Sequence, residues 1–199
     1  MSLHETLICN TTPVRYFALV DHLELLVRIL GGEVRVPRQV LDPDEDPDGI
    51  ESLVSEIAQS ERYWAKRSVD PEAMQNWDRL RKLRPRGDIR VVDLEDDELV
   101  AFSELVSPWY AKTIGLAGAL GLGEAAVIAI AECRSWTAVM DDALAREVLL
   151  RRGPGTGVVT TRELIRRAVG RDLIDSVEAQ SRYDHMLARG YQGPPGLWE

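Results

Sequence analysis

The stretch that decides the fold is residues 6–36, TLICNTTPVRYFALVDHLELLVRILGGEVRV. It begins with a short apolar run at residues 6–10, which is typical of a strand. Thr12, followed by a proline, is expected to cap a helix whose apolar residues recur at helical spacing up to Leu30. Residues 33–36 then alternate between apolar and polar side chains, as a second strand does. A strand, a helix and a strand of these lengths predict a βαβ unit and therefore a parallel sheet.

Strands and helices continue to alternate along the rest of the chain. The patterns predict strands at residues 88–94, 136–140 and 158–159, and helices at residues 50–66, 71–83, 96–106, 125–133, 142–152, from 160 or 161 onward, and 171–189. We expect residues 1–170 to form one α/β domain and residues 171–199 to add a C-terminal helix and tail. The tail, GYQGPPGLWE, is predicted to be a flexible or a docking segment.

The charge balance excludes one class of function. The 199 residues include 24 lysines and arginines against 33 acidic residues, which gives a net charge of −9. A general nucleic-acid coat protein must neutralise many phosphates, so this balance argues against one. A nuclease remains compatible, because a metal ion bound in an acidic site reverses the local field.

No membrane or secretory segment is expected. The longest apolar stretch, residues 114–131, is interrupted by glycines and an acid, and the N-terminus lacks a basic region followed by a long apolar run. Cys9 and Cys133 both lie in apolar segments, so we expect two buried free thiols of a reduced, cytoplasmic protein.

Polar residues gather where the predicted strands end. They are Asn10 after the first strand, Asp42 and Asp44 in an acidic turn after the second, Glu124 at a helix start, and Asp141 with Asp142 after a later strand. Ligands bind beyond the carboxyl ends of strands in an open parallel sheet. Clustered carboxylates repel one another unless a cation lies between them, and oxygen ligands suit Mg²⁺ or Mn²⁺ better than zinc.

Each of these residues also has a purely structural interpretation. Glu124 could be a first-turn acid favoured by the helix dipole, and Asp141 and Asp142 could cap the following helix. The turn that contains Asp42 could be solvated loop, and Asn10 could satisfy backbone groups at a strand end. The position of all four groups at equivalent strand ends favours a common site.

Four segments resemble successive blocks of the PIN-domain superfamily. In order they are LICNTTPVRYFALVDHLELL, GGEVRVPRQVLD, GLGEAAVIAIAE and VMDDALAREV, and the resemblance runs from about residue 7 to about residue 164. The sequence is most similar to a bacterial, often toxin-like branch in which asparagine is common at the first acidic position. The resemblance implies a three-layer α/β/α sandwich with a central parallel sheet.

The resemblance also implies a site and an activity. Asn10 falls on the first acidic position, Asp42 or Asp44 near the second, Glu124 on the third, and Asp141 or Asp142 on the fourth, while Arg146 and Thr161 match a basic residue and a threonine expected to contact substrate. Members are generally metal-dependent ribonucleases, and many are toxins of toxin–antitoxin pairs. Two departures are the neutral Asn10 and Pro43, which interrupts the block of the second acid.

We therefore expect an endoribonuclease that uses Mg²⁺ or Mn²⁺, with Glu124, Asp141 and Asp142 as its catalytic acids, an RNA substrate and an antitoxin as partner. Arg146 and the basic cluster at residues 79–90 are expected to contact phosphates, although they could equally form a solvated surface. The alternative is a catalytically degenerate PIN-like fold that serves as a binding or assembly module. The apolar helix face at residues 17–30 could form a homodimer interface or a core.

Overall fold

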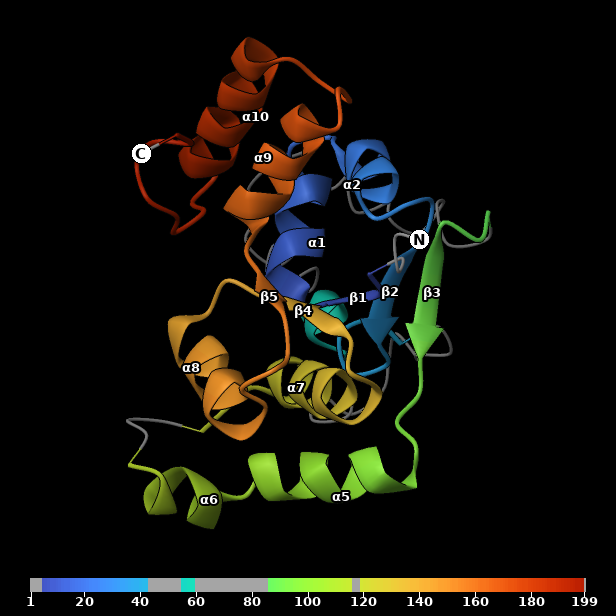
Figure 1. Ribbon diagram of the computed structural model, residues 1–199, viewed down its shortest axis with the longest axis vertical. Coiled ribbons are helices and arrows are strands. Elements are labelled where there is room, and N and C mark those ends of the chain that lie inside the picture. The colour runs from blue at the N-terminus through green and yellow to red at the C-terminus, as the bar shows by residue number, and fades with distance from the viewer. Residues whose placement is uncertain (1–4, 43–54, 60–85, 116–118, 199) are drawn as a thin grey trace.

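The computed structural model describes residues 5–42, 55–59, 86–115 and 119–198. Its elements, shown in Figure 1, are β1 Leu7–Cys9, α1 Thr11–Leu19, α2 Leu23–Ile29, β2 Val34–Pro37, β3 Ile89–Val92, α5 Asp96–Leu105, α6 Pro108–Thr113, α7 Leu122–Arg134, β4 Thr137–Val139, α8 Ala143–Arg152, β5 Val158–Val159, α9 Thr161–Gly170 and α10 Ser176–Ala188. The predicted helix at 71–83, most of that at 50–66, most of the basic cluster and Asp44 lie outside the described residues.

All strand pairs in the described chain are parallel, as the sequence predicted. β4 pairs with β1 on one side and with β5 on the other, and β2 pairs with β3. The ladders form a three-stranded and a two-stranded sheet that lie side by side at β1 and β2, so the strands follow the spatial order β3-β2-β1-β4-β5. The carboxyl ends of β1 and β4 meet at one edge, where the Asn10 N–H donates to the Val139 carbonyl at 2.9 Å.

The two faces of the sheet bury two separate hydrophobic clusters. Successive strand residues point to opposite faces, so Cys9 packs with α1, α2, α9 and α10, whereas Ile8 packs with α5, α6, α7 and α8. Figure 1 shows the same division, with α1, α2, α9 and α10 on one side and α7, α8, α5 and α6 on the other. The three-layer α/β/α architecture is therefore confirmed.

Helix α7 approaches the sheet closely. Every residue from Ala125 to Ala131 is buried to 0% exposure, and four of these seven are alanines. Small side chains let the helix axis lie near the strands, and α7 contacts β1, β2 and β4. The helix thereby fixes its own N-terminal turn, which contains Glu124, against the carboxyl edge of the sheet.

The first helix departs from the prediction in two ways. Asn10, not Thr12, occupies the N-cap position, and the helix divides into α1 and α2. The break falls at Asp21, whose φ of 59° is left-handed, a conformation that aspartate adopts more readily than most residues. The break lets both halves bury their apolar side chains, and Phe17 and Leu26 are each 0% exposed. This apolar stripe is part of the core.

The C-terminal segment is not a flexible tail. Tyr191 and Leu197 are 6% and 0% exposed and belong to the same cluster as α1 and α2. The segment docks on its own chain because these apolar residues are buried against α9 and α10, which the composition of GYQGPPGLWE does not reveal. The core thus extends across the predicted boundary at residue 170.

One cysteine prediction was also wrong. Cys9 is buried, as expected, but Cys133 is exposed because it lies in the last turn of α7, where the helix leaves the core. Among the described helices, none is both long and apolar enough to cross a membrane.

Candidate functional site

Asn10 occupies the junction between β1 and α1. It is 2% exposed, and its side chain makes no capping hydrogen bond to α1. Its Oδ1 atom is buried and accepts no hydrogen bond from any described residue. A buried acceptor without a donor costs about 1–3 kcal/mol. The position therefore favours an additional ligand, such as a cation, at the Asn10 oxygen.

Glu124 lies in the first turn of α7 and faces the same edge. Its Oε2 accepts a hydrogen bond from the Gly121 N–H at 2.9 Å, so the carboxylate also closes the start of the helix. Burial raises the pKa of Glu124, and the Gly121 N–H opposes that rise. The carboxylates of Asp142 and Glu56 raise the pKa further. Three acidic groups therefore influence one another at this edge.

Glu56 was not singled out from the sequence. Its Oε1 accepts from the Gly123 N–H at 2.8 Å, and its Oε2 accepts from the Thr11 hydroxyl. Its own N–H donates to the Gln39 carbonyl at 3.1 Å, which ties this segment to the chain that leaves β2. Glu56 thus joins the ends of β2, β1 and α7. Asp42 or Asp44 was the acid expected beside Glu124, and among the described residues Glu56 lies there as well.

Asp141 and Asp142 follow β4 but turn in different directions. Asp142 caps α8, because its Oδ1 accepts from the Ala145 N–H at 2.8 Å. Asp141 turns toward α9 instead. Its Oδ1 accepts from the Thr161 N–H at 2.9 Å and from the Tyr191 hydroxyl at 2.6 Å, and its Oδ2 accepts from the Thr161 hydroxyl at 2.5 Å. Thr161, which we expected to contact substrate, is fully buried and holds Asp141.

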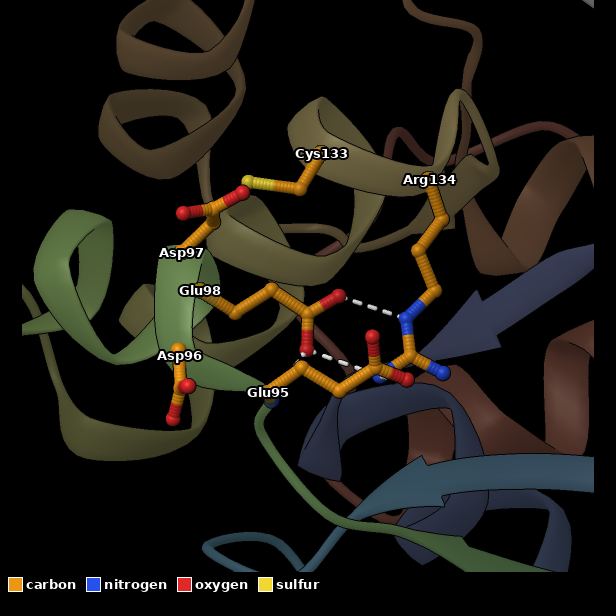
Figure 2. A pocket seen from close by; sticks show the side chains of 6 residues that line it. All are labelled: Glu95, Asp96, Asp97, Glu98, Cys133 and Arg134. Atoms are coloured by element: carbon orange, nitrogen blue, oxygen red, sulfur yellow. Dashed lines mark hydrogen bonds and ion pairs between the residues drawn. The ribbon is translucent and has the colours of Figure 1, made fainter.

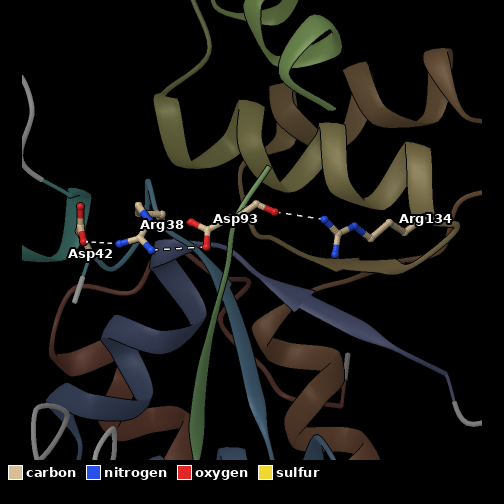
Figure 3. A network of polar contacts seen from close by, with 4 residues as sticks. All are labelled: Arg38, Asp42, Asp93 and Arg134. Atoms are coloured by element: carbon tan, nitrogen blue, oxygen red, sulfur yellow. Dashed lines mark hydrogen bonds and ion pairs between the residues drawn. The ribbon is translucent and has the colours of Figure 1, made fainter. Parts of the chain in front are cut away.

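Asp42 belongs to a separate network at the ends of β2 and β3. Its Oδ1 accepts from Arg38 at 2.8 Å, and Arg38 also binds Asp93 at 2.6 Å. Arg134 donates to the Asp93 carbonyl at 3.1 Å, as Figure 3 shows. The hydrogen bond from Arg38 lowers the pKa of Asp93. The structure brings Asp42 into an ion pair, and Glu56 is the acid that it brings to Glu124.

Arg146 lies one turn into α8, four residues after Asp142. Its Nε atom is buried and finds no acceptor within the part of the chain that the structure describes. A guanidinium nitrogen in this state offers a donor to an anionic ligand. The position agrees with the predicted contact to a phosphate, which stays a prediction.

The described side chains do not form a complete metal-binding site. No group of three or more histidine, cysteine, aspartate or glutamate residues among them is close enough to hold an ion. The donor types nevertheless fit a hard cation, since the amide oxygen of Asn10 and the carboxylates of Glu56, Glu124 and Asp142 are all oxygen ligands. The orphaned Asn10 oxygen is the strongest sign of fit.

Comparisons with known proteins add little to this geometry. No family model matches the chain, and no curated protein matches it. A search of solved structures matched a chain in the crystal structure of VapBC2 from Rickettsia felis bound to a DNA fragment from the promoter. The two are 15% identical, with a TM-score of 0.43 over 77% of this chain and 97% of that one.

An acidic pocket lies at the other end of α7. Figure 2 shows its lining: Glu95, Asp96, Asp97, Glu98, Cys133 and Arg134. Glu98 is 2% exposed, and both of its oxygens bind Arg134, which neutralises it. Glu124 and Arg134 are ten residues apart on one helix, a separation of about 15 Å. This pocket is therefore distinct from the edge that contains Asn10.

Proposed function

We propose that the chain is a metal-dependent endoribonuclease whose Mg²⁺ or Mn²⁺ is held by Asn10, Glu56, Glu124 and Asp142. The observation that carries the proposal is the buried Asn10 oxygen without a donor among the described residues, at an edge where burial, and to a lesser extent the carboxylates of Asp142 and Glu56, raise the pKa of Glu124. A divalent cation would satisfy both conditions, because it accepts the amide oxygen as a ligand and neutralises the repulsion.

The residues of the chain would divide the chemistry among them. A bound Mg²⁺ or Mn²⁺ lowers the pKa of a coordinated water and polarises a phosphodiester. Glu56 and Glu124 are kept in place by backbone N–H groups of the α7 start, so they present preorganised carboxylates. Arg146 would contact a phosphate through its Nε. With a net charge of −9, binding of a polynucleotide would depend on a few such arginines.

The choice of RNA as substrate rests on the four blocks that resemble PIN domains. The same resemblance supports a cytoplasmic toxin with an antitoxin as partner. A homodimer would need a surface other than residues 17–30, whose apolar side chains are in the core. Asp141 and Thr161 are not proposed ligands; their hydrogen bonds join the end of β4 to the start of α9 next to the site. Asp42 and Asp44 are replaced by Glu56 as the second acid in this proposal.

The test compares single-stranded RNA, structured RNA and DNA as substrates, with Mn²⁺, Mg²⁺ or EDTA. We expect cleavage of RNA that requires the cation and falls at least about tenfold in Glu124→Gln. Glu147→Gln is the matched control, because Glu147 is an exposed acid on α8 that pairs with Arg151. RNA cleavage that Glu124→Gln leaves unchanged would contradict the assignment. Preferential cleavage of DNA would keep the site and replace the substrate.

A binding or assembly module is the second candidate. The specific observation in its favour is that Glu124, Asp141 and Asp142 each already accept a hydrogen bond from the protein, beside a neutral Asn10. Calorimetric titration with Mn²⁺ separates the two functions. A degenerate site gives no saturable binding, whereas the proposed nuclease binds the ion and loses affinity in Glu124→Gln.

A further inference from the structure

The outer face of α10 carries two shallow hollows that meet along the helix. The residues that line the first are Ser176, Val177, Gln180, Ser181, Asp184 and Trp198. The second extends to Glu178, Arg182 and His185. Val177 and Ser181 line both hollows, which therefore form one continuous groove, the α10 groove.

The α10 groove contains apolar side chains that the fold leaves in solvent. Val177 is 78% exposed, more than any other large apolar side chain in the described part of the chain. Trp198 is 48% exposed, although Leu197 before it is fully buried and its carbonyl accepts from Arg166 at 2.6 Å. Figure 1 shows the C-terminal segment returning beside α10. The fold thus fixes this segment and still presents a tryptophan next to Val177, as the centre of a protein interface commonly does.

The charges along one edge of the groove change sign from one end to the other. Glu178 lies in the first turn of α10, and Arg182 and His185 follow toward its C-terminal end. The outer side of α5 is different, because Asp96 and Asp97 are exposed there at its first turn. Two copies of a chain with a net charge of −9 would bring like charges together at α5, whereas the α10 groove offers both signs.

An antiparallel pair of α10 helices matches these charges. In a two-fold symmetric dimer the same surface of each copy contacts itself, and an axis at Ser181 would place the two helices end for end. Glu178 would then lie beside His185 of the partner subunit, and the reverse contact would repeat it. On the other edge, Asp184 would lie beside the partner's Ser176, which has a hydroxyl to donate. The opposed helix dipoles also favour this orientation.

We infer that the α10 groove is a homodimer interface, in which a second copy of this chain packs its own α10 antiparallel across Ser181. The inference goes beyond the proposed nuclease activity and depends on neither the cation nor the substrate. α10 has 13 residues and is therefore about 20 Å long, so the contact is smaller than a standard interface of about 1,600 Å². We expect a reversible dimer with a Kd of about 10–100 µM.

Sedimentation velocity of the full chain over a range of concentrations tests the interface. We expect dimer to form as the concentration rises, and the Kd to increase at least about tenfold in Val177→Asp, which places a charge in the groove. Val100→Asp is the matched control, because Val100 is 72% exposed on α5 and the change in charge is the same. Its Kd should equal that of the wild type.

A cysteine cross-link tests the position of the axis. Cys133 is exposed and is first replaced in Cys133→Ser, whereas Cys9 is buried. In this background, Ser181→Cys is compared with Ser103→Cys, an exposed position on α5. A disulfide requires Cα atoms about 4.4–6.8 Å apart, so mild oxidation should join the copies at position 181 at least about ten times faster than at position 103.

Three results would overturn the inference. A chain that stays monomeric at every concentration leaves the groove to a different protein. A dimer that Val177→Asp weakens no more than Val100→Asp uses another surface. Equal rates of cross-linking at positions 181 and 103 mean that the α10 helices do not meet at Ser181. None of these results bears on RNA cleavage or on Mn²⁺ binding.

Discussion

Gly123 lies so close to Glu56 that a β-carbon at position 123 would stand 2.4 Å from a Glu56 carboxylate oxygen. The same β-carbon would lie 2.9 Å from a methyl group of Val40. The glycine is therefore what allows an acid from the chain after β2 to reach the first turn of α7. This contact between distant segments shapes the candidate site.

Gly123→Ala should push the Glu56 carboxylate away from the Gly123 N–H and strain Val40. We expect a loss of about 1–3 kcal/mol in the free energy of unfolding, measured with urea, together with weaker Mn²⁺ binding. Gly170→Ala is the control, because a β-carbon there meets no atom within 4 Å. Unaltered Mn²⁺ binding in Gly123→Ala would remove Glu56 from the site.

Asn10→Asp places a charge at the orphaned oxygen, beside acids that already repel. In EDTA we expect the free energy of unfolding to fall by at least about 2 kcal/mol, because a buried charge lacks a partner. Mn²⁺ should restore the stability and bind more tightly than in the wild type. Thermal unfolding with and without the ion measures both effects. A variant that Mn²⁺ does not stabilise would mean that no cation reaches position 10.

Glu124 should give stability a pH dependence. Its pKa in the fold is raised above the ordinary 4.5, chiefly by burial, so the folded protein holds this proton more tightly than the unfolded chain. The stability that it contributes is present below pH 4.5 and is lost as pH rises through the folded pKa. In EDTA, at a pH above the folded pKa of Glu124, Glu124→Gln should unfold at a higher urea concentration than the wild type. Below pH 4.5 the urea midpoints of the two proteins should be similar. Parallel curves would contradict this.

His22 should produce the opposite slope. Burial, with help from the charges of Arg182 and His185, lowers its pKa from 6.5 to about 4. Between pH 6.5 and about 4, His22 binds a proton in the unfolded chain but not in the folded protein. The free energy of unfolding therefore falls as pH drops through this range. His22→Gln should flatten this part of the urea midpoint curve. An unchanged slope in the variant would show that other groups cause it.

The buried ion pair between Glu98 and Arg134 should matter for stability and not for the site. Arg134→Ala leaves the Glu98 carboxylate, 2% exposed, without its partner, and should cost about 3 kcal/mol. Arg151→Ala breaks the exposed pair with Glu147 and should cost less than about 1 kcal/mol. Urea unfolding measures both. Mn²⁺ affinity should stay the same in each, because the pair lies at the far end of α7.

The sheet and its site-bearing edge could be predicted because their signals are local. Apolar runs mark the strands, and parallel pairing then places Asn10 and Asp142 at the same edge without further information. Glu124 follows from its position at the start of an apolar helix. Two of the structural interpretations were also correct, since Glu124 is an acid in the first turn of α7 and Asp142 caps α8.

The missed features all depend on contacts between distant parts of the chain. In the sequence, Glu56 is one more acid in a segment predicted to be a polar helix. Its contact with Gly123 is visible only in the structure. Tyr191 reads as part of a glycine- and proline-rich tail, and only its packing with Tyr16 and Tyr183 explains its burial. The break at Asp21 likewise depends on which packing buries Phe17 and Leu26. Periodicity along one segment contains none of this.

The alanine-lined face of α7 leads to a consequence for the tolerance of the protein to mutation. With residues 125–131 all at 0% exposure, a larger side chain has no free volume and must move the helix. That movement would carry Glu124 and Gly123 with it, away from Glu56. A library of random variants selected only for solubility should therefore be depleted at the same α7 positions as a library selected only for Mn²⁺ binding. Selection would act on these alanines as it acts on the proposed ligands, although none of them is one.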